Sequence, residues 1–341
     1  MRTMTAKLRR LPTGNIVYGE LPKGCQLCLR GRKSVIFVTG LCPRRCFYCP
    51  LSRERKGKDV VFVNELKVSD VRDIVREAAV SLSTGASLTG GDPLIRPKRT
   101  LKILKLLKSE FGENFHVHLY TSGISATREV LSDLVKAGLD EIRFHPPENL
   151  VNKLLDIIAP FAEKLDVGFE LPVLPNGEKE LCEVIEKLEK ANIKFVNLNE
   201  LEFSETNYAA LLQRGYQLAE DYIAAKGSRE TALKILYYAQ QQKVSLSVHY
   251  CPANSKDLFQ TSLRLYRRGL VAAHYIDYLT DHGTIVRIED AEKNPQAPPL
   301  PLGKDNNTVI ARVEWRNWLA KGRLVERHPT WDRFLVYSEN L

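Results

Sequence analysis

Three cysteines in one short loop are the residues of this sequence best suited to chemistry. Cys42, Cys46 and Cys49 are spaced C-x3-C-x2-C within LCPRRCFYCP. Thiolates are the soft ligands that hold iron–sulfur clusters, and three of them can bind three irons of a [4Fe–4S] cube. The fourth iron then needs a ligand from outside the loop. Zinc is the alternative metal, although structural zinc sites normally have four protein ligands.

Glycine and polar residues that follow predicted strands form the second candidate group. Gly90, Gly91 and Asp92 lie in TGGDPL, directly after an apolar run. Glycine lets a backbone approach a ligand closely, and a carboxylate beside it can accept hydrogen bonds from an ammonium group. Later strand ends carry further polar candidates, namely Ser122, Arg143, Glu170 and Asn197.

A second cysteine group lies outside the loop. Cys25 and Cys28 form C-x2-C before the first predicted strand, and Cys251 stands two residues after His249 in HYCPANSKD. Together they could bind zinc through Cys and His, or a second Fe–S cluster through three Cys. The strand order places the pair and Cys251 at opposite ends of a barrel. A looping N-terminal segment, or an antiparallel strand before Cys251, would bring the two segments to the same end. The alternative is that no second metal site exists, with the C-x2-C pair facing solvent and Cys251 simply buried.

Apolar runs that alternate with helix-period segments predict the architecture. The predicted strands cover 34–39, 86–90, 116–121, 139–144, 166–174 and 194–201. Helical patterns between them cover 67–80, 98–111, 127–138, 149–165 and 178–192. Such alternation gives right-handed parallel units, and barrels of this kind carry their chemistry at the carboxyl ends of the strands. We therefore predict an α/β fold with a partial (β/α)6 TIM-like barrel over residues 34–204.

The rest of the chain divides into three predicted regions. A basic N-terminal arm with the C-x2-C pair covers 1–33. A helical extension covers 205–270, with helices near 206–226, 228–242 and 254–268, and a strand is suggested at 244–250. A small C-terminal α+β or all-β region covers 271–341, with strands expected at 284–290, 308–315 and 333–339.

Charge and composition bear on compartment and partners. The formal net charge is +9, and residues 1–33 hold eight Lys or Arg against a single Glu. Such an arm can contact phosphates, or it can simply be solvated. Trp315, Trp318 and Trp331 lie among arginines and could stack on bases, although packing explains them as well. Five of seven cysteines fall within 25–49, and no apolar stretch is long enough to span a membrane. We expect a cytoplasmic protein.

The cysteine loop resembles the signature of the radical S-adenosylmethionine (SAM) superfamily, and the resemblance covers roughly residues 34–203. It implies a radical SAM barrel and a [4Fe–4S] cluster whose open iron is chelated by SAM. An external electron donor then drives cleavage to methionine and a 5′-deoxyadenosyl radical, which abstracts a hydrogen atom. The family has an aromatic residue before the last cysteine, near the adenine, and Tyr48 stands there.

The same resemblance extends to TGGDPL, which is similar to the family's Gly-Gly-Glu-Pro stretch. It implies that Gly90, Gly91 and Asp92 bind the SAM amino group, although Asp is one methylene shorter than Glu. Ser122 is then the candidate near the SAM carboxylate, and either Arg143 or His145 could face ribose or carboxylate. Glu170 and Asn197 are expected at the barrel mouth.

The sequence does not identify the substrate. The stretches CQLCLRGRKSVIFVTGLCPRRCFYCPLS and HYCPANSKD resemble archaeal radical SAM proteins described as related to pyruvate formate-lyase activating enzymes. That likeness allows a glycyl-radical partner or another peptide. The basic arm and the tryptophans favour RNA as the substrate, for example in the modification of transfer RNA. A hypothesis of another class is a non-catalytic zinc and nucleic-acid binding module without SAM affinity.

Overall fold

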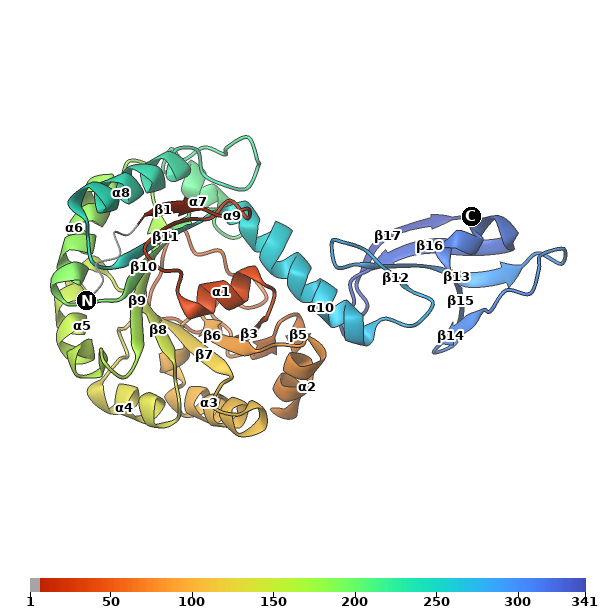
Figure 1. Ribbon diagram of the computed structural model, residues 1–341, viewed down its shortest axis with the longest axis horizontal. Coiled ribbons are helices and arrows are strands. Elements are labelled where there is room, and N and C mark those ends of the chain that lie inside the picture. Colours follow the sequence, from red (N-terminus) through yellow and green to blue (C-terminus); the bar gives the residue numbers. More distant parts are fainter. Residues whose placement is uncertain (1–6) are drawn as a thin grey trace.

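The computed structural model describes residues 7–341 and contains a large open sheet and a smaller second sheet (Figure 1). Residues 1–6, which include Arg2 of the predicted arm, lie outside the described part. The large sheet has eleven strands in the order β1-β2-β11-β10-β9-β8-β7-β6-β3-β4-β5. Because its two ends do not pair, the sheet is a partial barrel, which confirms the predicted fold class.

Seven neighbouring strands of this sheet run parallel. They are β3 (Lys33–Thr39), β6 (Gly85–Gly90), β7 (His116–Thr121), β8 (Glu141–Phe144), β9 (Asp166–Val173), β10 (Phe195–Glu200) and β11 (Ser247–Cys251). The first six agree closely with the predicted strands. The (β/α)6 count was one strand short, because β11 pairs parallel with β10 and extends the barrel.

Helices cover the outside of the ring of strands (Figure 1). They are α2 (Arg72–Val80), α3 (Pro97–Phe111), α4 (Arg128–Lys136), α5 (Val151–Ile158), α6 (Glu178–Lys190) and α8 (Ser228–Gln242). Successive side chains along each strand point to opposite faces of the sheet. On β7, Val117 and Leu119 belong to the apolar core, whereas His116, His118 and Tyr120 occupy the opposite face. The interior of the ring is therefore polar.

The N-terminal segment is part of the barrel and not a free arm. β1 (Leu8–Arg10) and β2 (Ile16–Tyr18) form a hairpin, and β2 pairs antiparallel with β11. The helix α1 (Lys23–Leu29) then lies inside the ring (Figure 1). Gly24 permits this approach, since a Cβ there would lie 2.7 Å from Arg143 Nη2. The backbone N–H of Gly24 donates to Glu141 Oε2 at 3.0 Å.

The remaining elements follow the barrel or border its edge. Two short antiparallel strands, β4 (Phe62–Val63) and β5 (Leu66–Lys67), extend the sheet beside β3. Beyond β10 come α7 (Tyr208–Leu212), α9 (Ala253–Ser255), a π-helical turn (Lys256–Thr261) and α10 (Ser262–Ala272). The predicted helix over 206–226 is wrong for most of its length, since only α7 forms there.

The second sheet follows α10 and contains β12 (Tyr278–Leu279), β13 (Ile285–Lys293), β14 (Gly303–Asp305), β15 (Thr308–Ala311), β16 (Leu319–Arg327) and β17 (Leu335–Asn340). Trp315 packs in its small core, whereas Trp318 and Trp331 are exposed. None of the helices within residues 7–341 has the length and apolar character needed to cross a bilayer.

Candidate functional site

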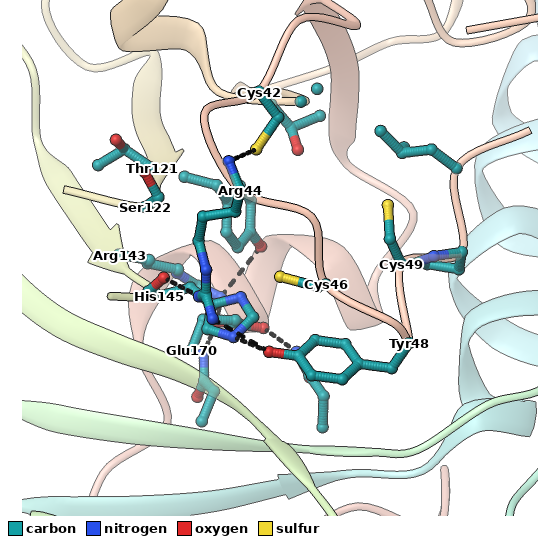
Figure 2. Close-up of a pocket in the computed structure, with 18 of the residues that line it drawn as sticks. Cys42, Arg44, Cys46, Tyr48, Cys49, Thr121, Ser122, Arg143, His145 and Glu170 are labelled. Atoms are coloured by element: carbon teal, nitrogen blue, oxygen red, sulfur yellow. Dashed lines mark hydrogen bonds and ion pairs between the residues drawn. The ribbon is translucent and has the colours of Figure 1, made fainter. Parts of the chain in front are cut away.

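The C-x3-C-x2-C loop borders a cavity of about 800 Å³ at the carboxyl ends of the parallel strands. The loop follows β3, and Cys42, Cys46 and Cys49 all line the cavity. Figure 2 shows the three sulfurs around this space. Cys42 is exposed and the other two are half-buried. Cys42 Sγ also accepts a hydrogen bond from the backbone N–H of Arg44 at 3.4 Å. All three thiols are therefore accessible to a metal cluster.

A segment that lies far away in the sequence holds the end of this loop. The amide of Asn207 donates to the carbonyl of Tyr48 at 3.0 Å, and the hydroxyl of Thr206 donates to the carbonyl of Cys49 at 3.3 Å. Phe47 stacks on Tyr216 with ring centroids 6.1 Å apart. The chain just after β10 thus fixes the position of the third cysteine.

Gly90 and Gly91 lie against the backbone that leads into the cysteine loop. The N–H of Gly91 donates to the carbonyl of Thr39 at 2.7 Å. A Cβ on Gly90 would lie 2.3 Å from the oxygen of Thr39, and one on Gly91 would lie 2.3 Å from the oxygen of Leu41. Only glycine fits at these contacts. Both glycines line the cavity.

Asp92 is not among the residues that line the cavity, and its carboxylate joins the ends of two strands. Its carboxylate is fully buried and accepts hydrogen bonds from the N–H of Leu94 at 3.0 Å, the hydroxyl of Thr121 at 2.8 Å and the N–H of Ser122 at 3.1 Å. The Ser122 hydroxyl is a further donor. Because these donors occupy the carboxylate, Asp92 is a positioning residue for Ser122, which itself lines the cavity.

Tyr48 contacts an imidazole from the end of β8 (Figure 2). Its hydroxyl lies 2.9 Å from His145 Nε2, and Arg44 Nη1 donates to the His145 carbonyl at 2.6 Å. Burial, together with the nearby guanidinium of Arg44, lowers the pKa of His145 to about 3. The imidazole is therefore neutral at physiological pH. These contacts hold the Tyr48 ring in the lining of the cavity.

Arg143, Glu170 and Asn197 form a polar network on the wall of the same cavity. Arg143 is buried and donates to Glu141 at 2.5 Å and to Glu170 Oε2 at 3.2 Å. The Asn197 amide donates to Glu170 Oε2 at 2.7 Å, and Asn199 donates to Glu170 Oε1 at 2.8 Å. Buried charges are tolerated when they are paired and hydrogen-bonded. Glu170 and Arg143 satisfy each other while still facing the cavity.

The second cysteine group is brought to the same cavity. Cys25 and Cys28 on α1, together with Cys251 at the end of β11, line it. The predicted conflict between barrel ends disappears because α1 enters the ring. Desolvation raises the pKa of Cys25 and that of Cys251 to about 12.

Sequence reasoning missed several residues at the cavity. Arg44, Lys33, Lys256 and Gln260 all line it. A lysine at a strand start and a glutamine in a polar helical run carry no local signal of this placement. For Arg44 the signal was its position between two of the cluster cysteines.

Comparison with known proteins identifies the class that this fold and cavity define. Residues 36–197 match the family model described as the radical SAM superfamily. A protein of Methanocaldococcus jannaschii, provisionally named a glycyl-radical enzyme activating enzyme, is 40% identical over 289 residues. The match covers 79% of this chain and 73% of that protein. The chain belongs to the radical SAM superfamily, and it is an enzyme of that class.

Other relatives share less. The PqqA peptide cyclase of Bradyrhizobium diazoefficiens is 25% identical over 57% of this chain and 53% of its own length. The crystal structure of Streptococcus suis SuiB bound to precursor peptide SuiA has a TM-score of 0.45 and 13% identity; the match covers 64% of this chain and 48% of SuiB. The chain thus spans about half the length of these two proteins.

Proposed function

We propose that this enzyme holds its [4Fe–4S] cluster through Cys42, Cys46 and Cys49 and cleaves SAM reductively in the 800 Å³ cavity. The observation that carries this assignment is that the three thiols, the two glycines and Tyr48 converge on one space. With cluster and SAM bound, an electron from an external donor yields methionine and a 5′-deoxyadenosyl radical. The donor set fits, because three accessible thiolates leave one iron free for SAM.

The residues around the cavity then have separable tasks. Gly90 and Gly91 offer backbone groups to the SAM amino group, and Ser122 offers its hydroxyl to the carboxylate. Tyr48, held by His145, contacts the adenine. Arg143, Glu170 and Asn197 present the polar wall that faces ribose or substrate. The protein-lined walls separate the radical from bulk water.

For the substrate we propose a protein or peptide. The support is the 40% identity to a provisional activating enzyme across most of this chain. The RNA substrate that the basic segment suggested has no support from the relatives. The basic residues of β1 also belong to a hairpin that pairs with the barrel sheet. We also propose a cytoplasmic location, because seven unpaired thiols suit a reducing compartment.

The substrate class can be tested by the turnover of SAM. Reconstituted enzyme, dithionite and SAM are incubated with extract of the source cells, and 5′-deoxyadenosine is measured. We expect stimulation by the extract that survives RNase and is lost after protease treatment. Stimulation that RNase abolishes and protease leaves intact would replace the protein substrate by RNA.

We propose in addition that Cys25, Cys28 and Cys251 bind a second metal, either zinc or iron–sulfur. Their approach from two distant segments to one cavity supports this.

A further inference from the structure

The structure assigns an iron–sulfur cluster, with three cysteine ligands and one iron open to the cavity, to Cys25, Cys28 and Cys251. This assignment rests on the second metal site proposed above, and it chooses an iron–sulfur cluster over zinc as the group bound there. The two α1 cysteines are one helical turn apart, and Cys251 ends the strand β11. The Gln260 side chain, from the π-helical turn, bridges the two segments: Cys28 Sγ donates to its Oε1 at 2.5 Å, and its Nε2 donates to Cys251 Sγ at 3.6 Å. One residue thus links the sulfurs of both segments.

Hydrogen-bond donors already surround the sulfur of Cys25. Arg143 Nη2 donates to Cys25 Sγ at 3.3 Å, and Asn197 Nδ2 donates to it at 3.5 Å. Donors of this kind stabilise thiolate over thiol and tune the potential of a cluster. Without a metal, burial outweighs this guanidinium and keeps the Cys25 thiol protonated. The same donors would hold the negative charge that a bound cluster places on this sulfur.

Lys33 provides a second cation beside the same sulfurs. Its side chain is almost completely buried and lines the same cavity as Cys25 and Cys28, and its ammonium lies 5.9 Å from the centroid of the Tyr120 ring. Within residues 7–341, no carboxylate forms an ion pair with Lys33. An unpaired buried charge is costly. A three-thiolate cluster would supply the missing negative charge.

The hydrogen bonds of two nearby side chains argue against zinc at this position. His249, the predicted fourth ligand, already uses both ring nitrogens: Nδ1 lies 3.0 Å from Asn197 Oδ1, and Nε2 lies 2.7 Å from Asn15 Oδ1. The carboxylate of Glu170 is occupied by Arg143, Asn197 and Asn199.

A [4Fe–4S] cluster can be held without a fourth protein ligand, whereas a structural zinc ion cannot. Structural zinc closes its shell with four protein ligands, whereas a [4Fe–4S] cluster held by three thiolates keeps one iron open. The three cysteines line the same cavity as Cys42, Cys46 and Cys49. The open iron therefore faces the space where the radical forms, and it can bind an oxygen or nitrogen ligand of the substrate there.

The decisive sample is the full chain with Cys42, Cys46 and Cys49 all changed to Ala. These residues belong to a half-exposed loop, so the fold should persist. After anaerobic reconstitution we expect about four irons and four sulfides per chain in this variant, about twice that in the wild type, and no SAM cleavage. Ferricyanide should convert the retained cluster to a three-iron form visible by electron paramagnetic resonance, because one iron lacks a thiolate.

Matched variants make the result specific. The Cys25→Ala/Cys28→Ala/Cys251→Ala variant should lose about half of the wild-type iron, and Cys182→Ala, on α6 and outside the cavity, should lose none. A folded triple variant of the loop cysteines without iron, or with zinc in its place, would overturn the assignment. Failure of the proposed SAM chemistry would instead appear as absent cleavage in wild type with full iron content.

Discussion

Replacing Gly91 by alanine probes how closely the glycine turn positions the cluster loop. The new Cβ would lie 2.3 Å from the oxygen and 2.6 Å from the carbonyl carbon of Leu41, the residue before Cys42. Real contacts to a Cβ are rarely shorter than 3.0 to 3.4 Å. Either the loop or the turn must therefore move by about 1 Å, and misplacement of that size can reduce a rate by about 100-fold.

The assay is reductive cleavage of SAM by reconstituted enzyme, together with iron content and thermal unfolding. We expect Gly91→Ala to lose about 100-fold in 5′-deoxyadenosine formation while unfolding remains cooperative, with about 1–3 kcal/mol lost to the clash. Gly112→Ala is the control, because Gly112 has a φ of +83° but no atom within 4 Å of its Cβ. That variant bears backbone strain without a clash.

Wild-type cleavage by Gly91→Ala, at normal iron content, would refute the idea that this contact positions the cluster. An equal loss in Gly112→Ala would attribute the effect to general destabilisation.

Three other substitutions test the contacts around the cavity. Asp92→Asn places an amide against the donors of Thr121 and Ser122, so we expect a loss of about 1–3 kcal/mol in urea unfolding; unchanged stability would contradict the positioning role. Tyr48→Phe removes the bond to His145 but keeps the ring, so SAM cleavage should fall less than in Tyr48→Ala; equal losses would show that the hydroxyl matters more. His145 has a pKa of about 3 in the folded chain against about 6.5 unfolded, so folding is favoured above pH 6.5 and weakened as the pH falls below it. Between pH 7 and 5 the free energy of unfolding of the apoprotein should fall by about 2 kcal/mol through this group, and that of His145→Gln should fall correspondingly less. An identical pH dependence of the unfolding free energy in the two proteins, measured with urea, would contradict the lowered pKa of His145.

Local patterns were enough to predict the barrel strands. The runs at 34–39, 116–121 and 166–174 are apolar and bounded by turns, and they coincide with β3, β7 and β9. The same patterns failed where local sequence is ambiguous. The segment 206–226 has helical composition but forms only α7, and β16 has so many charged residues that no apolar alternation marks it.

Long-range placement explains what the sequence could not predict about the site. The cysteine loop and the glycine turn follow consecutive parallel strands, so their proximity follows from strand order. The entry of α1 into the ring does not, because it depends on Gly24 fitting against Arg143 and on the Glu141 carboxylate. Whether the side chains of Asp92 and Glu170 line the cavity likewise depends on strand register and on partners from other strands.

The central claim is tested most directly by SAM cleavage in wild type and in the variant lacking Cys42, Cys46 and Cys49. Both proteins are reconstituted anaerobically and reduced with dithionite, and methionine and 5′-deoxyadenosine are measured. Cleavage by the wild type and none by the folded variant is the predicted result. Equal cleavage by both, or none by a wild type that has taken up iron and binds SAM, would contradict the assignment of these cysteines to the radical-generating cluster.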